Sequence, residues 1–194
     1  MKKAILLSIT ILLITKSHAQ DGYGYTKPDS ATLAKEEAEK PKFIPLEFSE
    51  VVKVDSVSKD DIYSRARAYI ATIYNDSKSV IQMDDRQAGI IIGKAIFRTH
   101  YKGLTIGAYN GFVDYNLKIE IKEGRFRFTM SSFVHTVINP QAISKLSLGL
   151  LTTDENYPYK APLFGTGTFN KIWRLLKEDA QINFKVILLS LIHI

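Results

Sequence analysis

The chain has 194 residues, of which 24% are charged, with a formal net charge of +6 and no cysteine. Without cysteine there can be no disulfide, no thiolate catalysis and no cysteine-ligated zinc, and a lipoprotein, which carries its lipid on a cysteine, is excluded as well. The basicity is mild and does not support a nucleic-acid partner, because nucleic-acid-binding proteins concentrate Lys and Arg in a patch and an exported protein rarely meets DNA.

The first 19 residues have the pattern of a cleavable secretory signal peptide. Lys2-Lys3 forms the positive start, and the apolar stretch at residues 4–14 is shorter than the roughly 20 residues that a membrane-spanning helix needs. Ser17-His18-Ala19 has small residues at the two positions that matter, so cleavage is predicted between Ala19 and Gln20. Losing the segment's three lysines lowers the net charge from +6 to +3. We expect an exported protein, periplasmic or secreted, with no transmembrane segment in the mature chain; an uncleaved anchor is the alternative.

The segment at residues 20–42 is polar and contains two prolines and a charged run, so we interpret it as a disordered or transiently helical tether. A single domain at residues 43–194 is predicted to follow, and it opens with a β-branched run typical of a strand, Phe48 to Val57. Ser58 and Asp61 have the spacing of a helix N-cap and its first turn, and apolar residues then recur at steps of three and four. The pattern predicts a helix from about Asp60 to Tyr74.

Strands are predicted next, at about residues 79–83 and from Gly89 to about His100, with a polar turn at 84–87 between them. The clearest pattern is a hairpin between Val113 and Phe133, in which apolar and polar residues alternate strictly around a Glu123-Gly124 turn. A two-residue loop there pairs position 121 with 126 and position 120 with 127. The hairpin then has one apolar and one charged face, which is typical of a sheet covered on one side only.

Residues 139–167 are interpreted as loop, rich in Pro, Gly and Tyr. A second helix is predicted to begin near Thr168, with Trp173 on an apolar face that packs on the sheet. We interpret Gly165-Thr166-Gly167-Thr168 as a turn with Thr168 as N-cap rather than as a phosphate-binding nest. The tail at residues 186–194 has no charge and no stop signal; it is either the end of this helix or a sequence foreign to the natural protein.

This order of elements resembles a family of exported domains of unknown function with a fold like that of the TATA-box-binding protein (TBP), domain of unknown function 4468. The matching features are the first strand and helix, the strand at 89–97, the hairpin at 113–133 and Lys171-Ile172-Trp173. The resemblance implies an α+β fold in which a curved antiparallel β-sheet has helices packed on one face, in the order β-α-β-β-β-β-α. It implies no established activity and no catalytic residues, and a fold shared with a DNA-binding protein does not imply DNA binding.

No motif in the chain specifies a reaction, a metal or a cofactor, so we expect none of the three. His100 and His135 are the histidines inside the predicted domain before its tail, and neither has the acidic or histidine neighbours that a metal site needs. The adjacent carboxylates Asp60-Asp61 and Asp84-Asp85 are interpreted as cap and turn residues. The rival hypothesis is a hydrolase whose site forms only in the fold, such as His100 or His135 with Asp114.

Aromatic residues in Gly- and Pro-rich segments are the candidate contact residues, because loops often expose them and amphipathic rings suit partner or ligand contact. These residues are Tyr101, Tyr109, Phe112, Tyr157 and Tyr159. The alternative is that they fill a small core from the loops. Our leading hypothesis is a non-enzymatic domain that binds a small ligand, a lipid or an envelope protein through these loops or through the open sheet face.

Overall fold

Residues 43–74, 80–138, 146–160 and 165–193 are described by a computed structural model. All of them lie in one unit, Lys42–Ile194. The predicted signal peptide, its cleavage site between Ala19 and Gln20, and the tether at residues 20–42 lie outside the described residues.

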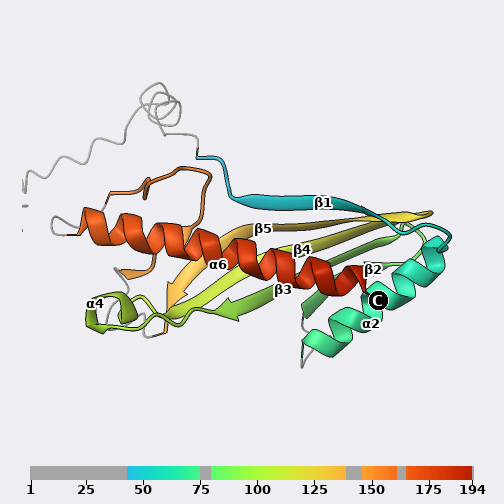
Figure 1. Ribbon diagram of the computed structural model, residues 1–194, viewed down its shortest axis with the longest axis horizontal. Helices are drawn as coiled ribbons and strands as arrows, with labels where there is room; N and C mark the ends of the chain where they lie inside the picture. The colour runs from blue at the N-terminus through green and yellow to red at the C-terminus, as the bar shows by residue number, and fades with distance from the viewer. Residues whose placement is uncertain (1–42, 75–79, 139–145, 161–164, 194) are drawn as a thin grey trace, which may run out of the picture. The chain divides into compact units, whose positions relative to one another are not determined.

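An antiparallel sheet forms the framework of this unit (Figure 1). Its strands are β1 (Glu47–Lys53), β2 (Ile81–Asp85), β3 (Ile90–Arg98), β4 (Gly111–Lys122), β5 (Arg125–Val137) and β6 (Gly149–Leu150). Their order is β1-β5-β4-β3-β2, and β6 pairs with β5 beyond the end of β1. The helices are α2 (Lys59–Ile73), the short α4 (Leu104–Gly107) and α6 (Thr166–Ile192).

The helix α2 starts where the sequence predicts it. The backbone N–H of Asp61 donates to Ser58 Oγ at 3.1 Å, and Ser58 Oγ donates back to the Asp61 carboxylate at 2.7 Å. The acidic first turn also suits the positive end of the helix dipole. Three of the predicted inward residues, Ile62, Ala66 and Ile70, are buried.

The hairpin of β4 and β5 has the predicted register, with Ile121 opposite Phe126 and Glu120 opposite Arg127. Gly124 sits in the turn at φ +65°, a conformation that glycine adopts without a steric penalty. One irregularity was not predicted. Ser132 has φ +57° and lies at a register shift, which makes it a β-bulge that turns both Met130 and Phe133 toward the core.

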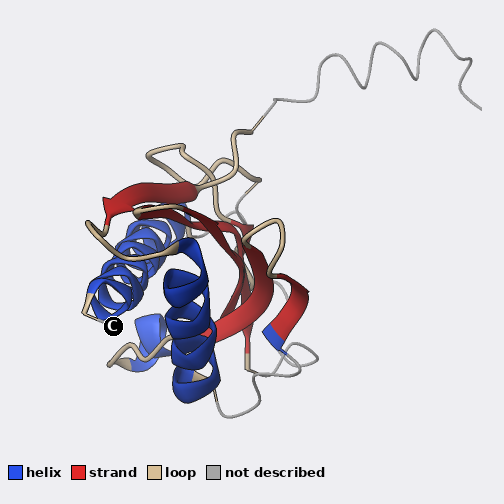
Figure 2. Ribbon diagram, turned by 90° about the vertical axis from the view of Figure 1, so that its right-hand side faces the viewer, coloured by secondary structure: helices blue, strands red, loops and turns tan. Residues whose placement is uncertain are grey.

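Helices α2 and α6 cover one face of the sheet, which curves around them (Figure 2). The side chains of Trp173, Leu176 and Ala180 on α6 are fully buried there, and the ring of Phe184 stacks on Phe128 of β5 with centroids 5.4 Å apart. Each large apolar side chain so buried contributes about 1.5–3 kcal/mol of transfer free energy. The buried faces of β4, β5 and the two helices therefore form the core.

The ends of α6 differ from the sequence expectation. The helix begins at Thr166 with Gly165 as N-cap, so Thr168 is a helical residue and not the cap. At the other end α6 continues through the uncharged tail to Ile192, because Leu188 and Leu191 face the core and are buried. Among the described residues, no helix combines the length and apolar character that crossing a membrane requires.

The α+β class, with an antiparallel sheet and helices on one side, is as the sequence predicts. The predicted order of elements also holds, with two additions in segments interpreted as loop. These are α4 and the two-residue β6, which is too short for its own sequence pattern to show.

Candidate functional site

The sheet has a second face, opposite α2 and α6, which we call the outer face. Its side chains alternate with the core residues along each strand. They are Glu47, Ser49, Val51 and Lys53 on β1; Arg125, Arg127, Thr129, Ser131, Val134 and Thr136 on β5; Phe112, Asp114, Asn116, Lys118, Glu120 and Lys122 on β4; Ile90, Ile92, Lys94, Ile96 and Arg98 on β3; and Met83 and Asp85 on β2.

Three cations lie side by side at one end of the outer face. Arg125 on β5 is paired with Lys53 of β1 on one side and with Lys122 of β4 on the other. We call these three residues the cationic row. All are exposed, and among the described residues none of them forms an ion pair. Like charges placed directly opposite each other on neighbouring strands are destabilising, so the fold tolerates this row at a cost.

The next row of outer-face residues toward the middle of the sheet contains Val51, Arg127 and Glu120, and its positive charge is partly neutralised. The Glu120 carboxylate lies 2.9 Å from Lys118 Nζ and 3.8 Å from Arg127, so one acid serves two cations. A groove of about 310 Å³ lies over these two rows, lined by Val51, Glu120, Lys122, Arg125, Phe126 and Arg127. The groove is therefore lined mostly by charged side chains, three cationic and one acidic, and Val51 is its exposed apolar side chain.

Three apolar side chains of the described residues are exposed on the outer face, one of them at the groove and two on the strands farther from it. Ile96 of β3 is 55% exposed, Val51 of β1 is 50% exposed and Met83 of β2 is 42% exposed. Ile92 is half-buried beside Met83, its partner across β2 and β3. Met83, Ile92 and Ile96 thus lie on the neighbouring strands β2 and β3, at the opposite edge of the sheet from Val51 on β1. Exposed apolar side chains on a sheet face favour contact with another molecule.

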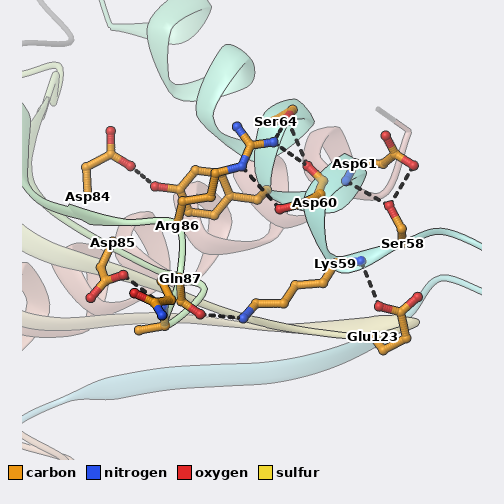
Figure 3. A network of polar contacts seen from close by, with 12 residues as sticks. Ser58, Lys59, Asp60, Asp61, Ser64, Asp84, Asp85, Arg86, Gln87 and Glu123 are labelled. Carbon is orange, nitrogen blue, oxygen red and sulfur yellow. Dashed lines mark hydrogen bonds and ion pairs between the residues drawn. The ribbon is translucent and has the colours of Figure 1, made fainter.

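A polar network at the same end of the sheet fixes the turns that carry the row (Figure 3). Lys59 Nζ donates to the backbone oxygen of Gln87 at 2.7 Å, and the Lys59 N–H donates to the Glu123 carboxylate at 3.0 Å. On the neighbouring side, Arg86 Nε contacts the Asp60 carboxylate at 3.1 Å. The Glu123 carboxylate is thus bound to the first turn of α2, although it follows Lys122 in the chain.

Backbone bonds hold the strand ends of the row against the same turn. The N–H of Val54, next to Lys53, donates to the Gly124 oxygen at 2.9 Å, and the Gly124 N–H donates to the Val57 oxygen at 3.3 Å. These bonds, with the β1 to β5 and β4 to β5 pairings, keep the backbone positions of the three cations on neighbouring strands. Lys53 was missed by sequence reasoning, since its partner on β5 follows only from that long-range pairing.

The predicted aromatic contact residues mostly pack against α6. Tyr157 lies with its ring 5.5 Å from Trp173 and 4.9 Å from Phe169, and Tyr109 packs edge-on to Phe169 at 5.6 Å. Tyr159 donates its hydroxyl to the Leu150 oxygen at 2.9 Å. This packing is the core-filling alternative considered from the sequence, and burial raises the pKa of all three tyrosines.

Tyr101 and Phe112 differ from that cluster. Tyr101 donates its hydroxyl to Asp179 of α6 at 2.7 Å, and burial first, then this bond, raises the tyrosine pKa. Phe112 is half-buried on the outer face, where its strand partners are Arg98 and Thr136. A binding role for the five aromatics stays a prediction, and Phe112 is the one placed on the open face.

The structure does not bring His135 and Asp114 together. His135 is fully buried on the core face of β5, whereas Asp114 is exposed on the outer face of β4. His135 Nδ1 accepts from the Leu148 N–H at 3.2 Å, and Nε2 lies 2.9 Å from the Tyr109 oxygen, to which it donates. Burial lowers the pKa of His135. His100 is exposed in the loop after β3.

The geometry defines a class, the TBP-like fold: an α+β domain with an open antiparallel sheet and helices on one face, while no helix of the described residues covers the other face. A family model described as domain of unknown function (DUF4468) with TBP-like fold matches residues 48–136. The resemblance to this family that the sequence indicates is confirmed over these residues.

Two solved structures are similar to the chain. One is a TBP-like protein from Parabacteroides distasonis ATCC 8503, with 10% identity and a TM-score of 0.54 over 76% of this chain and 92% of that one. The other is a DUF4468 family protein from Bacteroides ovatus ATCC 8483, with 14% identity and a TM-score of 0.56 over 76% and 86%. At this identity the similarity shows the fold. No curated protein matches the chain.

Proposed function

We propose that this protein is an exported, non-enzymatic binding domain that contacts a small ligand, a lipid or an envelope protein through the outer face of its sheet. The observation that carries the proposal is the sheet face that no described helix covers, on which Val51 is exposed at the cationic groove and Met83 and Ile96 are exposed on the strands farther from it. An apolar area bordered by charged residues is the usual composition of a contact surface. Phe112 belongs to this surface by its position on β4.

The arrangement of His135 favours binding over hydrolysis. A general base needs a free nitrogen within reach of a substrate proton. Both ring nitrogens of His135 are used by backbone groups in the core, so this residue stabilises the fold and is not available as a base.

Native mass spectrometry of the protein purified from its source tests the proposal. Wild type should retain a co-purifying molecule, and the double variant Ile96→Ser/Met83→Ser should lose it. The matched control is Ile182→Ser/Leu189→Ser, which removes two similarly exposed apolar side chains from α6. Retention by both double variants, or loss from both, would contradict binding at the outer face. Equal melting temperatures of the three proteins ensure that folding does not decide the outcome.

The export part of the proposal is tested separately, by sequencing the N-terminus of the protein after expression in its source. We expect a mature chain that begins at Gln20. A chain that still begins at Met1 would refute cleavage, while leaving the binding proposal open to its own test.

A further inference from the structure

The spacing of the cationic row defines the size of anything that could neutralise it. Neighbouring strands of a sheet lie about 4.8 Å apart, so Lys53, Arg125 and Lys122 on three adjacent strands span roughly 10 Å. Arg127 follows Arg125 on the same face of β5, two residues away. A single ligand of about 10 Å can therefore reach all four cations at once.

The row lacks an internal counter-charge. Glu120, the acid that lines the groove, is shared by Lys118 and Arg127, and the Glu123 carboxylate is bound to the Lys59 N–H. Among the described residues, no carboxylate therefore forms an ion pair with any of the three cations of the row. An anion bound there would remove the repulsion among these cations in addition to forming its own contacts.

The groove beside the row has the dimensions of a small-molecule site. Its volume of about 310 Å³ falls at the lower end of the roughly 300–1,000 Å³ that such sites occupy. Val51 lines it together with the cations and is 50% exposed, so a bound molecule meets one apolar side chain there.

We propose that this groove and the cationic row bind a small, soluble anion that carries two or more phosphate groups. Guanidinium groups bind phosphate oxygens in a fork, and lysine ammonium groups supply compact point charges, so this mixture of side chains suits phosphate. One phosphate reaches only part of the row, whereas a chain of phosphates spans it. The inference rests on the proposed function, because it assigns a ligand class to one part of the outer face.

The test is isothermal titration calorimetry of the full mature chain with inorganic tripolyphosphate. Orthophosphate, which has a single phosphate group, is the comparison. The key variant is Lys122→Gln/Arg125→Gln. Its matched control is Lys94→Gln/Arg98→Gln, which removes the same charge from exposed positions elsewhere on the outer face. Binding to phosphatidylglycerol vesicles is measured as well, because they present phosphate groups in a lipid surface. Phosphatidylcholine vesicles are the control for this measurement.

We expect tripolyphosphate to bind more tightly than orthophosphate, with an affinity that falls as NaCl is raised. Each removed charge of the row should weaken binding about fivefold, so the key variant should lose roughly 25-fold. The control variant should lose less than about threefold. The melting temperature of the key variant without ligand should equal or exceed that of wild type, because a like-charge contact is gone.

No binding of tripolyphosphate at millimolar concentration would overturn the proposal. So would equal affinity for orthophosphate, equal losses in the two variants, or binding to phosphatidylglycerol vesicles alone. If tripolyphosphate fails while Ile96→Ser/Met83→Ser still loses the co-purifying molecule, the ligand class is wrong and the outer-face function stands. If both experiments fail, the outer face is not a binding surface.

Discussion

The buried histidine on β5 predicts a specific dependence of stability on pH. His135 is neutral in the fold, with Nδ1 accepting from the Leu148 N–H and Nε2 donating to the Tyr109 oxygen. Adding a proton at Nδ1 would set two N–H groups against each other in a site without solvent. Burial therefore lowers the folded-state pKa below its ordinary value of 6.5, while the unfolded chain keeps that value.

The direction of the change in stability with pH depends on whether the folded or the unfolded chain binds the proton first. As the pH falls through 6.5, the unfolded chain takes up a proton at His135 that the folded chain does not, so stability is full above this pH and decreases below it. One proton corresponds to at most about 1.4 kcal/mol per pH unit. Between pH 7.5 and 5.5 the loss from this residue is at most about 1.4 kcal/mol, the value for a folded group that stays neutral while the unfolded group passes from mostly neutral to mostly charged.

Urea denaturation at pH 7.5, 6.5 and 5.5 measures this loss in wild type and in His135→Gln. The variant should be less stable at pH 7.5 but should lose little more as the pH falls, because glutamine does not titrate. His100 and His193 are exposed and are retained in both proteins, so they serve as an internal control. Equal slopes for the two proteins would refute the assignment of a neutral, backbone-bound His135.

Three further substitutions test the packing with matched controls. Ser132→Gly at the bulge should leave the free energy of unfolding unchanged or raise it by up to about 1 kcal/mol, because φ +57° is a left-handed conformation that glycine adopts without strain. The neighbouring Ser131→Gly is the control and should lower the free energy of unfolding by about 0.5–1 kcal/mol. Destabilisation by both substitutions would argue against the bulge. Leu188→Ala, which truncates a buried side chain, should lower the free energy of unfolding by about 2–5 kcal/mol in chemical denaturation. Leu189→Ala, at an exposed position, should lower it by under about 0.5 kcal/mol. Equal losses would mean that the tail does not pack as a helix. Ser58→Ala should lower the free energy of unfolding by about 1 kcal/mol, because it removes the N-cap of α2. Ser190→Ala, inside α6, is the control and should change it very little. A Ser58→Ala protein as stable as wild type would contradict the N-cap.

The elements that the sequence predicts best are those fixed by local patterns. Alternation around Glu123-Gly124 determines the β4 to β5 register, because a slip by one residue would turn every apolar side chain to water. Helix α2 is defined by Ser58 and by the spacing of its apolar residues. In both cases the determining residues are close together in the chain.

The features that were missed depend on long-range pairing or on one irregular residue. Lys53 joins the cationic row only through the pairing of β1 with β5, some seventy residues away in the chain. The bulge at Ser132 reverses the alternation of β5, so His135 faces the core instead of sharing the outer face with Asp114. A signal for the bulge was present, since the apolar residues Met130 and Phe133 are three positions apart and not two.

The aromatic loop residues show a different limit of sequence reasoning. Tyr157 and Tyr159 come from a Pro-rich segment, where exposure is as common as packing, and the partner that buries them is Trp173 on α6. Whether these tyrosines are exposed or packed depends on where the loop meets α6, and no local sequence pattern encodes that position.

The most direct test of the outer face as the binding surface is lysine footprinting by mass spectrometry. The protein is acetylated in buffer and in a fractionated extract of its source, and modification at Lys53, Lys94, Lys118 and Lys122 on the outer face is compared with that at Lys171 and Lys185, exposed on α6. We predict that the extract protects the outer-face lysines and leaves the α6 lysines unchanged. Protection confined to α6, or equal at both surfaces, would contradict the assignment.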